Sequence, residues 1–125
     1  MDDAPLIALE QTLHREMPIS VPMAIRAVAW DGRQLSVEMP LEPNRNHQYS
    51  AFAGSLNALC TIAGWGAIFL MLRREKLAGN IVIRRSQIRY SRPVRSPKII
   101  AQSLPLHADA EGTLVTFSGS YVIQN

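Results

Sequence analysis

The hydrophobic and polar residues of this chain follow two periods, one typical of helices and one of strands. At the amino end, Leu6, Leu9 and Leu13 recur at helical spacing, which predicts a helix that begins near Asp3 and ends before Pro18. Alternating apolar residues then predict strands over 21–29 and 35–39, with a hairpin turn at Asp31-Gly32. Later alternation predicts strands over 81–90, 99–106 and 115–123.

A long uncharged segment separates the second strand from the third. Residues 48–72 contain no charged side chain, and they follow a polar loop that begins at Asn44. A helix that is apolar on nearly every side must be covered by protein or by lipid. The polar Ser55, Asn57 and Thr61 and the flanking strands favour a protein cover over a membrane span. We expect Gly79 to cap the end of this helix.

These elements predict an α+β fold in which one antiparallel five-stranded sheet wraps around a long central helix, with a short N-terminal helix beside it. The reason is that a mostly antiparallel sheet has one face to cover, and only the uncharged helix is apolar enough to cover it. In the third strand the apolar phase changes between Ile83 and Ile88, which indicates a β-bulge or a first half buried on both faces.

Composition narrows the possible functions. A chain of 125 residues with 47% hydrophobic residues suits one domain, residues 1–125, with a real core. The single cysteine, Cys60, excludes an internal disulfide, and no His, Cys or carboxylate pattern predicts a metal site. No signal-peptide pattern is found, so we expect a cytoplasmic protein.

Charge is distributed unevenly. One segment holds six cations and no acid, whereas the rest of the chain is net −3. The six are Arg84, Arg85, Arg89, Arg92, Arg95 and Lys98. A local basic strip on a mildly acidic body favours an anionic ligand over nucleic acid, although a solvated strand face explains it equally well.

The loop before the helix offers the candidate chemistry. The side chains of Asn44 and Asn46 either satisfy the turn or orient a carbonyl or a water, and His47 is either an exposed polar residue or a general base. Gly54 and Ser55 are expected to open the helix, where unpaired N–H groups can polarise a carbonyl oxygen.

Several motifs together resemble a known family. The runs Asn44-Arg-Asn-His47, Ala51-Phe-Ala-Gly-Ser-Leu56 and Ala63-Gly-Trp-Gly66 are similar to the thioesterase domain of the hotdog superfamily that elsewhere follows an N-acetyltransferase domain. The resemblance covers roughly residues 17 to 123. It implies a hotdog dimer with acyl-thioester sites at its interface. Asn46 stands six residues before Phe52, and Thr61 stands nine after it, where related enzymes often have a carboxylate.

The sequence therefore predicts an acyl-thioester hydrolase that acts on acyl-CoA or an acyl-carrier-protein thioester, without a cofactor. We expect a homodimer or a dimer of dimers that binds neither nucleic acid nor membrane. The alternatives are a non-catalytic acyl-CoA- or lipid-binding hotdog protein, a hotdog dehydratase or hydratase, and a structural partner module. The candidate catalytic residues are Asn46, His47, Gly54, Ser55 and Thr61. The candidate substrate-binding residues are Asn44, Phe52, Arg84, Arg85, Arg89 and Arg92.

Overall fold

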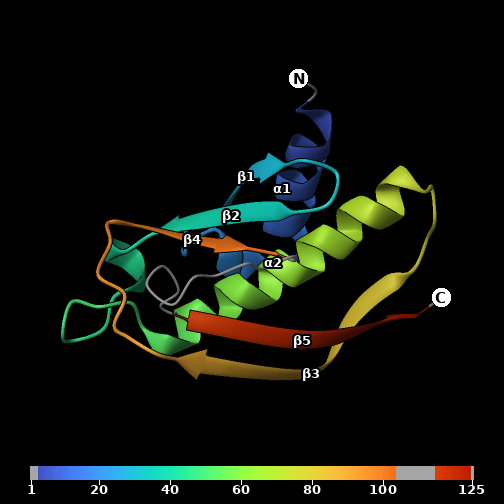
Figure 1. Cartoon of the computed structure of the whole chain (residues 1–125). Coiled ribbons are helices and arrows are strands. Elements are labelled where there is room, and N and C mark those ends of the chain that lie inside the picture. The colour runs from blue at the N-terminus through green and yellow to red at the C-terminus, as the bar shows by residue number, and fades with distance from the viewer. Residues whose placement is uncertain (1–2, 104–114, 125) are drawn as a thin grey trace.

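The computed structural model describes residues 3–103 and 115–124 (Figure 1). Its helices are α1 (Ala4–Glu16) and α2 (Ala53–Arg74), with short 3-10 helices η1 (Pro18–Ser20) and η2 (Glu42–Asn44). Its strands are β1 (Arg26–Trp30), β2 (Leu35–Pro40), β3 (Asn80–Tyr90), β4 (Lys98–Gln102) and β5 (Val115–Gln124). This order confirms the predicted α+β class with a long central helix.

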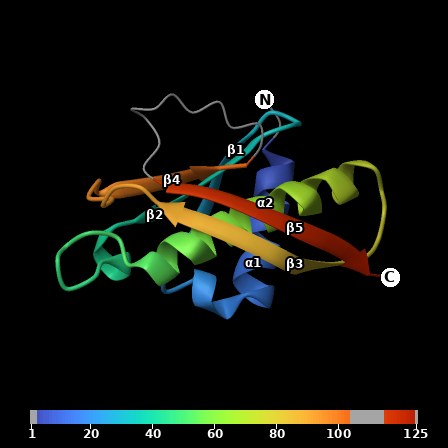
Figure 2. The ribbon, with the colours of Figure 1, turned by 60° about the horizontal axis from the view of Figure 1, so that its bottom comes forward.

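The strands lie on two sides of α2. One group has the antiparallel order β1-β2-β4, and the other is the antiparallel pair β3–β5, which we call the ribbon. In Figure 1 the central helix runs between the two groups, and in Figure 2 the ribbon lies in front of the helix. The predicted single sheet is therefore divided into two hydrogen-bonded groups in the described part of the chain. A shift of register between Ile83 and Arg85 confirms the β-bulge in β3.

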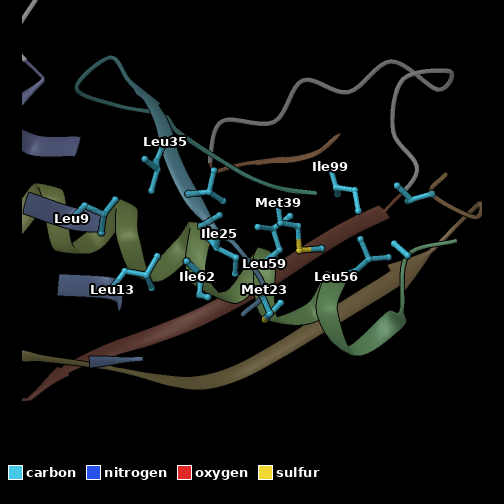
Figure 3. Packing of buried hydrophobic residues seen from close by; sticks show 14 of the residues in the cluster. Leu9, Leu13, Met23, Ile25, Leu35, Met39, Leu56, Leu59, Ile62 and Ile99 are labelled. Carbon is cyan, nitrogen blue, oxygen red and sulfur yellow. The ribbon is translucent and has the colours of Figure 1, made fainter. Parts of the chain in front are cut away.

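The core lies between α1, α2 and the three-stranded sheet (Figure 3). Alternate residues of β2, namely Leu35, Val37 and Met39, are fully buried, as a half-buried strand requires. They meet one face of α2, which buries Leu56, Leu59, Ile62, Ala63, Gly66 and Leu70. Gly66 lets this face approach closely, because a Cβ atom there would lie 2.7 Å from Leu35 Cδ2.

Two local predictions need correction, and part of a third cannot be compared. The first strand begins at Arg26 rather than at residue 21, because the chain first makes turns in which Ala24 adopts a positive φ of 58°. Helix α2 ends at Arg74, and the left-handed residue that follows is Lys76 (φ 56°), so Gly79 is not its cap. The last part of the predicted strand 99–106 lies outside the described residues, and β4 ends at Gln102.

By length and composition, α2 could cross a membrane, and it is the one such helix in the described part of the chain. That is weak evidence, because the core helices of many proteins have the same composition. Here α2 contacts α1 and the strands β2, β3, β4 and β5, and 33% of its most apolar stretch is buried within the protomer.

Candidate active site

The amino end of α2 is open. Its N-cap, Phe52, has extended backbone angles and makes no side-chain capping bond, and its own N–H donates to the Asn44 carbonyl at 2.7 Å. The next three N–H groups, of Ala53, Gly54 and Ser55, have no partner among the described residues. Ala53 and Gly54 are also exposed. The positive end of a 22-residue helix dipole therefore presents unpaired donors to solvent, as predicted for Gly54 and Ser55.

Two aromatic side chains border this helix start. The Phe52 ring lies against Gly54, where an added Cβ would meet Phe52 Cε2 at 2.6 Å, and the ring is 54% exposed. The Tyr90 hydroxyl, at the end of β3, donates to the Ala53 carbonyl at 3.2 Å. Sequence reasoning placed Tyr90 in a strand but missed this contact, since strand alternation gives only the face of a residue and not its partner.

The Asn46 amide is engaged within its own loop. Its Oδ1 accepts hydrogen bonds from the backbone N–H groups of Gln48 (2.8 Å) and Ser50 (3.2 Å), and its Nδ2 donates to Ser50 Oγ at 3.0 Å. This is the side-chain turn that asparagine favours. Asn46 therefore fixes the shape of the loop in front of α2, and its catalytic role stays a prediction.

Asn44 is buried behind the loop, with only 2% of its surface exposed. Its Nδ2 donates to the carbonyls of Met23 (2.9 Å) and Pro40 (2.8 Å), and its Oδ1 is buried without a partner among the described residues. Asn44 thus ties the loop to two other segments. Its burial and its two hydrogen bonds give Asn44 a structural role in the loop, and substrate binding by Asn44 stays a prediction.

The histidines differ in their surroundings. His47 is exposed and has no hydrogen-bond partner in the described part of the chain, so no neighbour orients it as a base. His14 is half-buried, and its Nε2 donates to the Ile25 carbonyl at 2.8 Å. His107 lies outside the described residues. No cluster of three or more metal-binding side chains is found among the residues described.

A polar pair lies farther along α2. The Thr61 hydroxyl donates to Asn57 Oδ1 at 3.3 Å, one helical turn away, and both residues are half-buried. The Tyr121 hydroxyl, from β5, donates to the Thr61 backbone carbonyl at 2.8 Å. Sequence reasoning named Thr61 but missed Asn57 and Tyr121. The available signal for Asn57 was its i,i+4 spacing from Thr61 within an uncharged helix.

Burial keeps the neighbouring acidic groups of this region neutral. It raises the pKa of the Cys60 thiol to about 11. Burial, with a smaller contribution from Cys60, raises the pKa of the Tyr121 hydroxyl to about 12. Cys60 therefore carries no thiolate near neutral pH, which agrees with a hydrophobic rather than a nucleophilic role. Tyr121 remains a hydrogen-bond donor over the whole physiological range.

The predicted arginines do not share one face. Arg85 and Arg89 are four residues apart in β3 and lie on the face opposite to Tyr90, whereas Arg84 falls at the bulge and Arg92 follows the strand. All four side chains are exposed. Arg84, Arg85 and Arg89 form no ion pair with the residues described here. Their charges are thus available to an anion.

An antiparallel strand assembly around one long helix defines a hotdog-fold protein, and an uncapped helix start bordered by a polar loop fits the thioesterases of that class. The chain belongs to the family described as Putative thioesterase (yiiD_Cterm), which matches residues 6–120. The predicted family and fold are thereby confirmed.

Solved structures of similar proteins share this fold. A putative thioesterase from Shewanella oneidensis is 29% identical and superposes with a TM-score of 0.89, covering 99% of this chain and 100% of its own. A protein of unknown function from Chlorobaculum tepidum is 26% identical, with a TM-score of 0.86 over 95% of this chain and 94% of its own. A thioesterase from Haemophilus influenzae, at 20% identity and a TM-score of 0.79, covers 96% of this chain and 90% of its own and shares the fold.

Proposed function

We propose that this protein hydrolyses acyl thioesters, with acyl-CoA as the carrier form. The open start of α2 is the observation that carries the proposal. A thioester carbonyl oxygen placed there accepts a hydrogen bond from the Gly54 N–H, with the Ser55 N–H beside it. Attack by water turns this oxygen into an oxyanion, and preorganised N–H groups at a helix start stabilise that charge.

The attacking water requires positioning and a proton acceptor. Thr61 of the same subunit lies about 10 Å along α2 from Gly54, so the Thr61 hydroxyl and the Asn57 amide of a second subunit are the groups that orient this water across the interface. Neither group takes a proton at neutral pH, so deprotonation falls to another group, and His47 is the candidate base on the adjacent loop. In the protomer His47 has no orienting partner among the described residues, which favours a site completed by a second subunit.

We further propose a homodimer, alone or as a dimer of dimers, with the site at the subunit interface. Strand β3 pairs with β5 along one edge, and its other edge has no strand partner in the described residues. Val82 and Ile83 of β3 are 41% and 37% exposed. An unpaired edge with exposed apolar side chains near its start suits pairing with a second copy of the same strand. The expected compartment is the cytoplasm, where acyl-CoA is produced and used.

The exposed arginines suit the phosphates of coenzyme A. A guanidinium group forms paired hydrogen bonds with phosphate oxygens, and Arg85 and Arg89 can act together since they lie on one face. An acyl-carrier-protein thioester would present acidic side chains to the same two arginines. Acyl-CoA is favoured here because its phosphates are multiply charged and both arginines are exposed, with no ion pair among the described residues.

The decisive experiment compares two substitutions at Gly54 in purified protein, with thiol release from acyl-CoA as the readout. Gly54→Pro removes the N–H donor, whereas Gly54→Ala adds a Cβ atom but keeps the donor. Proline is tolerated in a first helical turn, and Pro5 already occupies that position in α1. We expect Gly54→Pro to turn over about a hundredfold more slowly than Gly54→Ala. Equal turnover by the two variants would remove the oxyanion role.

A second candidate function is binding of acyl-CoA without hydrolysis. Two observations favour it: Thr61 stands where related enzymes often have a carboxylate, and the Asn46 amide is already engaged in its loop. Calorimetric binding of several acyl-CoAs with no thiol release over hours would establish this function. A dehydratase would need a histidine paired with a carboxylate, and neither His14 nor His47 has such a partner among the described residues.

A further inference from the structure

Two tyrosine hydroxyls attach the ribbon to α2. Tyr90 of β3 donates to the Ala53 carbonyl at 3.2 Å, and Tyr121 of β5 donates to the Thr61 carbonyl at 2.8 Å. The ribbon makes no strand pairing with the three-stranded sheet in the described residues, so these bonds are specific links between the ribbon and the helix. They bracket the part of α2 that runs from its open start to the Asn57–Thr61 pair.

The Tyr121 ring lies across α2 at Gly64. A Cβ atom at Gly64 would be 2.5 Å from the Tyr121 hydroxyl and 2.9 Å from both Cε1 and Cζ. Only glycine therefore admits the ring in this position. On its own strand, Gly119 leaves similar room, because a Cβ there would be 3.2 Å from Tyr121 Cε1. The ring thus fills the space between helix and ribbon immediately beyond Thr61.

On the amino side of that ring, residues of the helix and of the ribbon keep part of their surface accessible. Asn57 and Thr61 on α2, Ile88 on β3 and Phe117 on β5 are all only half-buried, although the ribbon packs on the helix. On the opposite face of α2, six residues are buried against the core. Ile88 and Phe117 are also direct register partners, so they form a continuous apolar surface that faces α2. This surface suits an alkyl chain.

We propose that Tyr121, admitted by Gly64, closes the far end of the acyl site and sets the longest acyl chain that the protein accepts. The inference depends on the proposed thioester function, with the carbonyl at Gly54 and the acyl chain running along α2 toward Tyr121. Thr61 and Gly64 lie about 10 and 15 Å along the helix axis from Gly54. An extended chain advances about 1.2 Å per bond, so the limit falls at about eight to twelve carbons.

The test measures kcat/KM for a series of saturated acyl-CoAs, from short to long, with wild-type protein and with Tyr121→Ala. The wild-type value should fall sharply beyond about twelve carbons. In Tyr121→Ala the fall should move to longer chains by roughly four carbons, because an alkyl segment of that length fills the space of the missing phenol ring. Tyr121→Phe is the matched control, because it removes the anchoring hydroxyl but keeps the ring, and its chain-length profile should match that of the wild type.

A purely structural role for Tyr121 gives a different result. Loss of folded protein lowers kcat/KM for all acyl chains by the same factor, so the chain length at which kcat/KM drops does not change. That outcome would overturn the proposal. If Tyr121→Ala does not fold, Tyr121→Leu is measured in the same way and should give a smaller shift in the same direction; an unchanged profile there also overturns it.

The inference can fail separately from the proposed function. If wild-type protein hydrolyses no thioester of any length, the hydrolase proposal is lost, but the length limit remains testable through binding. Affinity for acyl-CoA, measured by calorimetry, should then rise with chain length up to the same limit and stop rising. If affinity rises without a limit, or if Tyr121→Ala leaves the limit unchanged, the role of Tyr121 is refuted whatever the catalytic result.

Discussion

Gly66→Ala should destabilise the protein, although alanine is the better helix former. The added Cβ atom would lie 2.7 Å from Leu35 Cδ2 and 3.3 Å from Leu9 Cδ2, and these leucines are 0% and 1% exposed. The helix gains about 1 kcal/mol from the change, whereas overpacking a closed core costs about 1–3 kcal/mol. We therefore expect a net loss of up to about 2 kcal/mol in the free energy of unfolding.

Gly54→Ala in the same helix is the matched control. Its Cβ atom would also meet a side chain, the Phe52 ring at 2.6 Å, but that ring is 54% exposed and can turn away. Urea unfolding followed by circular dichroism, at one fixed protein concentration, gives both free energies. Gly66→Ala should be the less stable variant by about 1–3 kcal/mol, which is the overpacking cost.

A double substitution makes the test stricter. Leu35→Ala should itself cost about 2–5 kcal/mol, because it leaves a cavity in a fully buried site. In that background the Gly66 Cβ atom fills vacant space, so Gly66→Ala should become neutral or stabilising. The reasoning is refuted if Gly66→Ala is as stable as Gly54→Ala, or if it costs the same with and without Leu35.

Three further predictions address the site. Asn46→Ala should lower the free energy of unfolding by about 1–2 kcal/mol and speed amide exchange in residues 48–50, because it removes the bonds that hold the loop. Burial raises the pKa of the Cys60 thiol from 9.0 to about 11, so the folded state holds this proton more tightly than the unfolded state does. Unfolding above pH 9 therefore releases the proton, and the free energy of unfolding should fall between about pH 9 and 11. The fall should be smaller in Cys60→Ala. Arg85→Glu with Arg89→Glu should raise KM for acyl-CoA but not for the same acyl group on N-acetylcysteamine, which carries no phosphate.

The fold was predictable because its main signals are long and redundant. A helix of 22 residues, charged only at its last two, and strands of alternating polarity leave few arrangements that bury the apolar surface. The errors lie where the conformation of a single residue decides where a helix ends or a strand begins. Lys76 takes the left-handed conformation expected of Gly79, and the turn at Ala24 delays the first strand to Arg26. Local backbone sterics favour glycine at such positions, but tertiary packing overrides that preference.

The site was predictable only in part. Gly54 was placed at the helix start because the polar loop gives way there to small and apolar residues. Asn46 could not be assigned, because an asparagine that holds a turn and one that holds a substrate have the same side chain and the same spacing. Tyr121 could not be found at all, because its contact with Thr61 joins residues 60 positions apart. Such a contact exists only after the ribbon has folded onto α2.

The two sides of α2 therefore have different roles. The side toward the three-stranded sheet buries leucine, isoleucine and alanine side chains and admits no further atom, so substitutions there act on stability. The side toward the ribbon keeps Asn57 and Thr61 partly accessible and attaches its strands through tyrosine hydroxyls. A ribbon held by few specific bonds can be altered without loss of the core. Variation in acyl specificity among proteins of this fold should therefore concentrate on the ribbon and on the helix face that it covers.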